Sequence, residues 1–309
     1  MGERSYPSYL ALYESGELAE RVERARELSE RCVLCPRACL VRRTRDEVGE
    51  CGVGRYALVS SYGPHFGEES VLRGWRGSGT VFFAGCNMRC VYCQNYEISQ
   101  LRLGREVSPR EMAEIFLEVQ RMGCHNLNLV TPSHVVWQIL EALLLAVERG
   151  FRLPIVYNTS SYDSLQSLKL LDGVVDIYMP DLKYSDSKVA ERYSGVRGYW
   201  EVARKAVKEM HRQVGVLELD ERGLARRGLL IRHLVLPNGI AGSKEVMRFI
   251  AEELSRDSWV NVMDQYRPEY RAWEFPELAR PITRREYWEV VEYARSLGIH
   301  RGIPFSHTS

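Results

Sequence analysis

The chain has 309 residues, in which 42 Lys and Arg residues balance 41 Asp and Glu residues to give a formal net charge of +1. This balance provides neither a basic footprint for nucleic acid nor an acidic tail, so we expect no nucleic-acid partner. The sequence contains no apolar stretch as long as a membrane span, and residues 1–4 carry no apolar signal core. We therefore expect a cytoplasmic protein without a membrane partner, whose length allows one large domain with appendages or two domains.

The first 75 residues are expected to form a helix followed by a cysteine-rich module. Apolar residues recur at helical spacing at Leu18, Val22, Ala25 and Leu28. A C-x2-C-x3-C-x11-C pattern follows at Cys32, Cys35, Cys39 and Cys51. Because cytoplasmic cysteines rarely form disulfides, this spacing indicates a metal centre. Structural zinc and an auxiliary [4Fe–4S] cluster are both compatible with four thiolates, and the grouping of three cysteines favours the cluster slightly.

Basic residues lie among these cysteines, at Arg37, Arg42, Arg43 and Arg45. Such residues stabilise a negatively charged thiolate centre when they face it, because opposite charges attract strongly away from water. The same residues would form an ordinary solvated face if they point outward. The sequence leaves both interpretations open.

From Gly79 onward, strand-like and helix-like segments alternate. Six apolar runs are predicted strands: Thr80–Phe83, Asn126–Val130, Pro154–Tyr157, Val174–Met179, Val214–Leu217 and Leu229–Leu236. Capping boxes at Ser108–Glu111 and Thr283–Glu286, and a Thr131-Pro132 pair, predict helix starts. Six strand–helix units predict an α/β fold, as a partial (β/α)6 barrel or an open doubly wound sheet. We expect the barrel over residues 76–255 and a C-terminal extension over residues 256–309.

A second cysteine pattern directly follows the first predicted strand. Cys86, Cys90 and Cys93 form a C-x3-C-x2-C run in one short loop. Three thiolates can hold three irons of a [4Fe–4S] cube, and the fourth iron then stays open as a reaction site. The alternatives are a zinc knuckle or three unrelated buried thiols, but zinc usually takes four ligands from paired C-x2-C motifs.

Polar residues follow several of the other predicted strands. In both candidate folds the carboxyl ends of the strands bind ligands. Thr131 is expected to begin a helix whose free N–H groups suit a carboxylate, and residues 158–160 offer small donors and acceptors for a ribose. Lys183 would hold a carboxylate of a ligand or pair with Asp181 or Asp186. Polar residues after a strand are often only caps and turns, so no single one of them predicts a binding site. The prediction of a site rests on finding several such strand ends beside the cysteine loop.

The cysteine spacing, with Tyr92 directly before Cys93, resembles the signature of the radical S-adenosylmethionine (SAM) superfamily. Asp181-Leu-Lys183 and residues 231–237 are similar to the pyruvate formate-lyase activating enzyme group of that superfamily, over residues 76–260. The resemblance implies SAM contacts at Asn128, Thr131, Asn158, Thr159, Ser160, Asp181, Lys183, Arg232 and His233. The group's Gly-Gly-Glu motif is replaced by residues 128–134, so the chain is closer to uncharacterised homologues of that enzyme.

The resemblance implies a radical SAM enzyme. Such an enzyme chelates SAM at the open iron, takes one electron from a donor such as ferredoxin or flavodoxin, and forms a 5′-deoxyadenosyl radical. The radical then takes a hydrogen atom from a substrate that the sequence does not identify, a small molecule, a peptide or RNA. The resemblance implies no catalytic residue beyond the cluster ligands.

Two other functions remain open at this point. An activating enzyme would form a glycyl radical on a partner protein and would need an open mouth that admits a loop, whereas direct modification predicts that the cysteine-rich module caps the mouth. A non-catalytic iron–sulfur electron carrier or a zinc scaffold would need neither an open iron nor a cofactor-sized mouth. Cleavage of SAM on reduction separates this last class from the first two.

Overall fold

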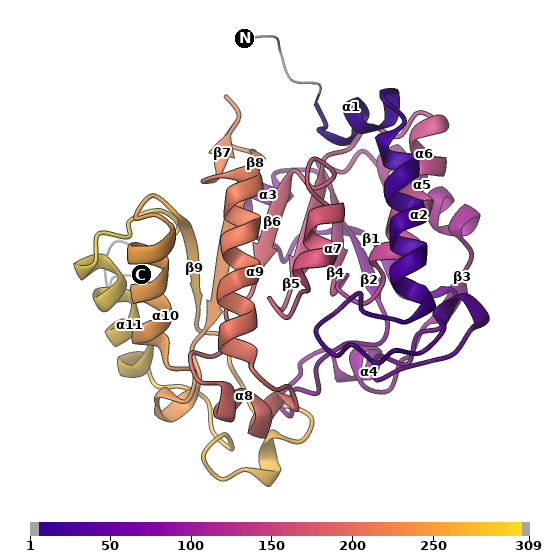
Figure 1. Ribbon diagram of the computed structural model, residues 1–309. Helices are drawn as coiled ribbons and strands as arrows, with labels where there is room; N and C mark the ends of the chain where they lie inside the picture. Colours follow the sequence, from indigo (N-terminus) through magenta and orange to yellow (C-terminus); the bar gives the residue numbers. More distant parts are fainter. Residues whose placement is uncertain (1–5, 305–309) are drawn as a thin grey trace.

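The computed structural model describes residues 6–304 and contains an open sheet with six parallel strands (Figure 1). In spatial order these are β2 (Ser78–Phe83), β4 (Leu127–Val130), β5 (Ile155–Thr159), β6 (Ile177–Pro180), β8 (Ala225–Leu234) and β9 (Trp259–Met263). β1 (Ala57–His65) pairs antiparallel with β2, and β3 (Arg105–Val107) pairs antiparallel with β1. β7 (Glu218–Leu219) forms a short antiparallel pair with β8.

Most of the helices cover the outer face of this sheet. The longer ones are α1 (Tyr9–Glu14), α2 (Glu17–Glu30), α5 (Pro109–Arg121), α6 (Val136–Glu148), α7 (Leu165–Leu170), α8 (Ser187–Ser194), α9 (Tyr199–Val214), α10 (Ser243–Phe249) and α11 (Arg284–Ser296). Shorter ones are α3 (Ser70–Arg73), α4 (Tyr96–Ser99), three 3-10 turns (Arg43–Arg45, Pro237–Gly239, Ala272–Glu274) and a π-helical turn (Ile250–Leu254). Both predicted capping boxes are confirmed, at the starts of α5 and α11.

The two faces of the sheet have different cores, and this distinguishes a partial barrel from a doubly wound sheet. Tyr157 and Tyr178 point outward into the large core beneath the helices. Val156 and Ile177, one residue earlier on the same strands, belong to a small separate core on the inner face. Successive strand residues point to opposite faces, so these neighbours belong to different cores. The inner core is small because the sheet curves around it and, in the described part of the chain, no second layer of helices covers that face. The predicted partial (β/α)6 barrel is confirmed.

The structure differs from the predicted elements in three places. The predicted strand Val214–Leu217 is not a strand: Val214 ends α9, the chain turns at Gly215, where φ is 73°, and Val216 forms only an isolated bridge with Leu229. The sixth parallel strand is β9, in the segment expected to be an extension. The helix expected to begin at Thr131 begins at Val136, because the residue before a proline avoids the helical region and Thr131 has a φ of 58°.

The segment after β1 crosses the open side of the barrel. It leads into α3, whose Val71 and Leu72 enter the small inner core. Glu69, at the N-cap of α3, accepts a hydrogen bond from Asn261 on β9 at 2.9 Å. The segment therefore connects the first and the last parallel strands and closes part of the gap between them.

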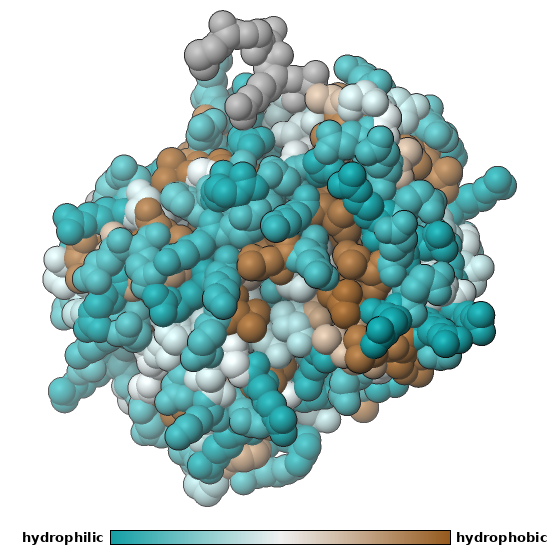
Figure 2. All heavy atoms as spheres, viewed as in Figure 1, coloured by the Kyte–Doolittle hydropathy of each residue, from teal (hydrophilic) through white to brown (hydrophobic). Residues whose placement is uncertain are grey.

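Hydrophilic residues cover most of the face seen in Figure 2, with a band of hydrophobic residues in the region between α9 and α2. The helices within residues 6–304 include none with the length and apolar character needed to cross a membrane.

Candidate active site

A cavity of about 360 Å³ lies at the carboxyl ends of the parallel strands. The cysteine loop after β2 forms one wall. The predicted site residues that line it are Cys86, Cys90, Cys93, Thr131, Asn158, Thr159, Ser160, Asp181, Lys183 and Arg232. Parallel strands bring these residues together because their carboxyl ends meet at one edge of the sheet.

The cysteine loop turns sharply as it leaves β2. Gly85 has a φ of 80°, and a Cβ placed there would lie 2.5 Å from the carbonyl oxygen of Cys51, so only glycine is tolerated. The backbone N–H of Met88 donates to Cys86 Sγ over 3.3 Å, and Ser194 Oγ lies 3.0 Å from Cys90 Sγ as its donor. The loop is thus folded with its sulfur atoms already engaged by donors, as suits thiolate ligands of a cluster.

Burial raises the pKa of the Cys86 thiol to about 12, and the neighbouring cysteines add to this shift. The pKa of Cys90 is also raised by burial, which outweighs the opposing attraction of Lys183. Metal binding at these thiols therefore requires proton release, as is general for thiolate ligands.

A buried charge network faces the cysteines across the cavity. Asp181 accepts a hydrogen bond from Lys183 Nζ at 2.8 Å and another from Arg232 Nε at 2.7 Å. Arg232 Nη2 also donates to Asn158 Oδ1 at 2.8 Å, which ties β8 to β5. Burial disfavours the charged form of Asp181, but Arg232 and Lys183 outweigh burial and hold its pKa at about 2. Lys183 thus pairs with Asp181, whereas Asp186 caps α8.

The residues after β5 form a second polar network. Thr159 Oγ1 donates to Asp163 Oδ2 at 2.6 Å and lies 2.9 Å from Ser133 Oγ. The carbonyl of Ser160 accepts a hydrogen bond from the Tyr199 hydroxyl at 2.9 Å. These contacts hold the polar strand end in one arrangement while its residues still line the cavity.

Two predicted site residues do not line the cavity. His233 follows Arg232 on β8 and points to the opposite face, where its ring nitrogens contact the carbonyl of Leu182 and the Ser243 hydroxyl. Strand alternation explains this, since neighbours on a strand cannot face the same side. Asn128 lies fully buried on β4, and its amide nitrogen and oxygen have no hydrogen-bond partner.

The cavity also contains residues that the sequence did not single out. His65, Gly67 and Glu68 come from the segment after β1, and Met263 and Gln265 come from the end of β9. The strand-end rule would have found Met263 and Gln265 if β9 had been recognised as a strand. Nothing local in the sequence places residues 65–68 opposite the cysteine loop.

The four cysteines of the N-terminal module line a second, smaller cavity together with Arg37, Arg43 and His134. Arg43 is fully buried and donates hydrogen bonds to the backbone carbonyls of Gly54 and His134. Within residues 6–304 it has no carboxylate partner, and its Nη2 atom and that of Arg37 are buried without hydrogen-bond partners. Burial raises the pKa of Cys51, and Arg43 acts in the opposite direction.

The described residues contain no group of three His, Cys, Asp or Glu side chains that could hold a metal ion as they stand. The donor set of the module nevertheless fits a metal–thiolate centre, because the unpaired buried guanidinium of Arg43 faces four thiols. Charge and ligand chemistry alone do not distinguish zinc from a cluster here.

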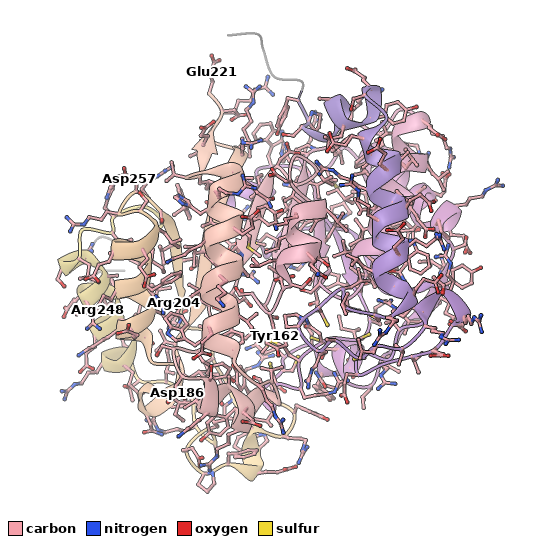
Figure 3. All side chains as sticks on the ribbon, viewed as in Figure 1. Tyr162, Asp186, Arg204, Glu221, Arg248 and Asp257 are labelled. Carbon is pink, nitrogen blue, oxygen red and sulfur yellow. The ribbon has the colours of Figure 1, made fainter. Side chains whose placement is uncertain are left out.

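The module packs behind the catalytic cysteine loop. Arg37 Nε donates to the carbonyl of Asn87 at 2.8 Å, and the carbonyl of Cys51 lies against Gly85. The Asn87 side chain in turn donates to the carbonyl of Tyr162, labelled in Figure 3, at 2.7 Å. Residues 32–51, which carry the four cysteines, do not line the main cavity, whereas His65, Gly67 and Glu68 do. The cysteine segment therefore does not cap the mouth, contrary to what direct modification was expected to require.

Comparison with known proteins identifies the class of this site. The family model of the radical SAM superfamily matches residues 80–220, which contain the cysteine loop and the ends of β4, β5 and β6. The chain belongs to the radical SAM superfamily, and this membership implies a [4Fe–4S] cluster and SAM as cofactors.

The chain is similar to two uncharacterized proteins of Methanocaldococcus jannaschii. It is 34% identical to MJ0674 over 90% of this chain and 78% of the relative. It is 25% identical to MJ0808 over 89% of this chain and 79% of the relative.

Two solved structures are more distant. The crystal structure of methylornithine synthase (PylB) has a TM-score of 0.45 and 14% identity over 69% of this chain and 60% of that one. The crystal structure of HydG, a maturase of the [FeFe]-hydrogenase, has a TM-score of 0.46 and 11% identity over 96% of this chain and 66% of that one. This chain thus spans less than two thirds of the length of either structure.

Proposed function

We propose that this protein cleaves SAM reductively and removes a hydrogen atom from a substrate in the main cavity. The observation that carries the proposal is the shared cavity of Cys86, Cys90 and Cys93 with the Asp181 charge network. An iron–sulfur electron carrier or a zinc scaffold would need no such cavity beside its cysteines.

The residues of the cavity divide the binding work. Cys86, Cys90 and Cys93 would hold three irons of the cluster, and Lys183 would receive the SAM carboxylate. Thr131 also lines the cavity but begins no helix, so it would contact SAM only through its own polar groups. The polar end of β5, residues 158–160, would contact the ribose. When bound, the cluster supplies an electron, and SAM supplies a 5′-deoxyadenosyl group that becomes the hydrogen-abstracting species. The protein orients these groups and excludes water.

Several features support a small substrate over a glycine on a partner protein. The segment after β1 spans from β1 to β9 and narrows the open side of the barrel. The cavity volume of about 360 Å³ is at the lower end of ordinary ligand pockets, and SAM would fill part of it. A ferredoxin or flavodoxin is the proposed source of the electron.

The test is made on anaerobically purified protein with reconstituted iron and sulfide. Dithionite and SAM are added, and 5′-deoxyadenosine is measured by chromatography. We expect product from the unaltered protein and none from a variant with Cys86, Cys90 and Cys93 changed to Ala. Cys124→Ala is the matched control, because this buried thiol lies outside both cysteine sets. Absence of cleavage by a protein with a full cluster would contradict the proposal.

We also propose that Cys32, Cys35, Cys39 and Cys51 hold an auxiliary [4Fe–4S] cluster, with structural zinc as the alternative. Four thiolates around either metal centre carry excess negative charge, which would compensate the buried guanidinium of Arg43. Iron and zinc analysis distinguishes the two. We expect about eight irons per chain, falling to about four when the module cysteines are changed to Ala. One zinc per chain that disappears in that variant would favour the zinc alternative.

A further inference from the structure

Glu68 lines the main cavity but has no role in binding the cluster or SAM in the proposed function. It lies on the segment between β1 and α3 that crosses the open side of the barrel. Its side chain is only 8% exposed, and Arg232 Nη1 is its ion-pair partner at 3.7 Å. This distance exceeds that of a hydrogen bond, and Arg232 already donates to Asp181 and Asn158.

Three carboxyl groups and two cations lie close together here: Glu68, Glu69 and Asp181 beside Lys183 and Arg232. All of these except Glu69 line the cavity, as does His65, and Glu69 adjoins Glu68 in the chain. Asp181 engages both cations through hydrogen bonds. The Oε2 atom of Glu69 is buried without a hydrogen-bond partner. The surplus acceptor capacity therefore lies at Glu68 and Glu69.

The protonation of Glu68 reflects this imbalance. The pKa of Glu68 is raised to about 7, mainly by burial; Arg232 opposes this shift, and Glu69 and Asp181 add to it. Ionisation of Glu68 is thus unfavourable in the empty cavity. A cation that enters beside it would pair with the carboxylate and release its proton.

The wall of the cavity also offers apolar surface. Phe82 on β2, Leu234 on β8 and Met263 on β9 line the same cavity. An acidic group at one point and an apolar wall beside it suit an alkyl chain that ends in a positive charge.

We propose that Glu68, assisted by Glu69, binds a positively charged nitrogen of the substrate, either an alkylammonium or an alkylguanidinium group. The substrate of this protein is accordingly a cationic small molecule or a basic side chain of a short peptide. The inference rests on the proposed function because both concern the same cavity.

Isothermal titration calorimetry on the anaerobically reconstituted protein tests the inference. The probes are pentylamine, pentylguanidine and the neutral pentanol, each at pH 6 and pH 8. We expect both cations to bind at pH 8 at least tenfold more tightly than pentanol. Both cations stay charged over this range, and we expect several-fold weaker binding at pH 6 because Glu68, whose carboxyl is influenced by Glu69, Asp181 and Arg232, becomes protonated. His65 and Lys183 line the same cavity, so the pH effect belongs to Glu68 only if Glu68→Gln abolishes it.

Variants separate a binding role from a structural one. Glu68→Gln should lose the preference for cations over pentanol, and Glu68→Asp should retain part of it. Glu97→Gln is the matched control, because Glu97 is exposed on α4 and does not line the cavity. Circular dichroism checks that each variant is folded.

Three outcomes would overturn the inference. Pentylamine and pentanol could bind equally well, neither cation could bind, or binding could be unchanged in Glu68→Gln. Calorimetry requires no SAM cleavage. A protein that cleaves SAM but ignores cations would therefore refute only this inference, and one that binds cations but never cleaves SAM would refute only the proposed function.

Discussion

At the scale of single residues, Asp181 is the carboxylate that pairs with both cations of the site, Lys183 and Arg232. Asp181→Asn would leave Lys183 and Arg232 as buried cations with no full counter-charge, which costs about 3 kcal/mol of unfolding free energy. Chemical denaturation at pH 7 measures this cost. The control is Asp186→Asn at the exposed cap of α8, which should cost only about a few tenths of a kcal/mol, because Asn caps a helix about as well as Asp.

The same pair of proteins shows a pH dependence with a defined sign. The pKa of Asp181 is about 2 in the folded protein, below the value of about 3.9 in an unfolded chain. Its stabilising contribution is therefore complete above pH 4 and is lost as the pH falls through 2. The stability difference between the unaltered protein and Asp181→Asn should shrink over that range. A constant difference would show that Asp181 acts through packing instead of charge.

The contribution of Glu68 to stability depends on pH in the opposite direction to that of Asp181. Its folded pKa of about 7 exceeds the unfolded value of about 4.3, so its contribution is most favourable below pH 4.3 and is lost as the pH rises through 7. Glu68→Gln, which does not titrate, should gain unfolding free energy relative to the unaltered protein between pH 5 and pH 8. Thermal denaturation in the absence of substrate measures this, and a gain independent of pH would contradict the assigned environment.

At the scale of elements, the cysteine loop depends on the close approach of two backbones. Gly85→Ala would place a Cβ 2.5 Å from the Cys51 carbonyl and also strain a residue with φ of 80°. Gly150→Ala is the control, because its φ of 89° is similar but no atom lies within 4 Å of the added Cβ. Both variants should lose about 1–2 kcal/mol from the backbone strain. Only Gly85→Ala should also lose iron on reconstitution, measured as iron per chain.

The elements also show how far local patterns lead. The capping boxes of α5 and α11 satisfy backbone groups within four residues of each other, so the sequence alone predicts them. β9 was missed because a parallel strand is expected to be apolar on both faces, and Asn261 interrupts the pattern. The hydrogen-bond partner of Asn261, Glu69, lies 192 residues earlier in the chain. A local sequence pattern cannot predict a contact between residues so far apart.

The site residues also divide into those that the sequence predicts and those that depend on contacts between distant segments. Residues after β4, β5 and β6 were predicted because the ends of parallel strands meet whatever their sequence separation. Glu68 was not predicted, because it reaches the cavity from an irregular segment. Tyr266, just after β9, is buried, and its hydroxyl donates to the carbonyl of Leu278 at 2.7 Å. It anchors the C-terminal segment.

At the scale of the whole molecule, the N-terminal module and the barrel meet at the two cysteine loops. Arg43 is fully buried in this region and has backbone carbonyls as partners, so its charge requires compensation from the module. A buried cation beside a negatively charged metal–thiolate centre is stabilising, whereas the same cation beside neutral thiols is costly. The contribution of Arg43 should therefore reverse its sign when the centre is removed.

A double-mutant cycle tests this reversal. In metal-loaded protein, Arg43→Met should lower the unfolding free energy by about 3 kcal/mol, because the centre loses its counter-charge. In a background with Cys32, Cys35, Cys39 and Cys51 changed to Ala, the same substitution should be neutral or stabilising, because it removes an unpaired buried charge. The difference between the two effects is the coupling energy between Arg43 and the centre. Equal effects in both backgrounds would mean that Arg43 acts only through its hydrogen bonds to Gly54 and His134, and that the module holds no negatively charged centre next to it.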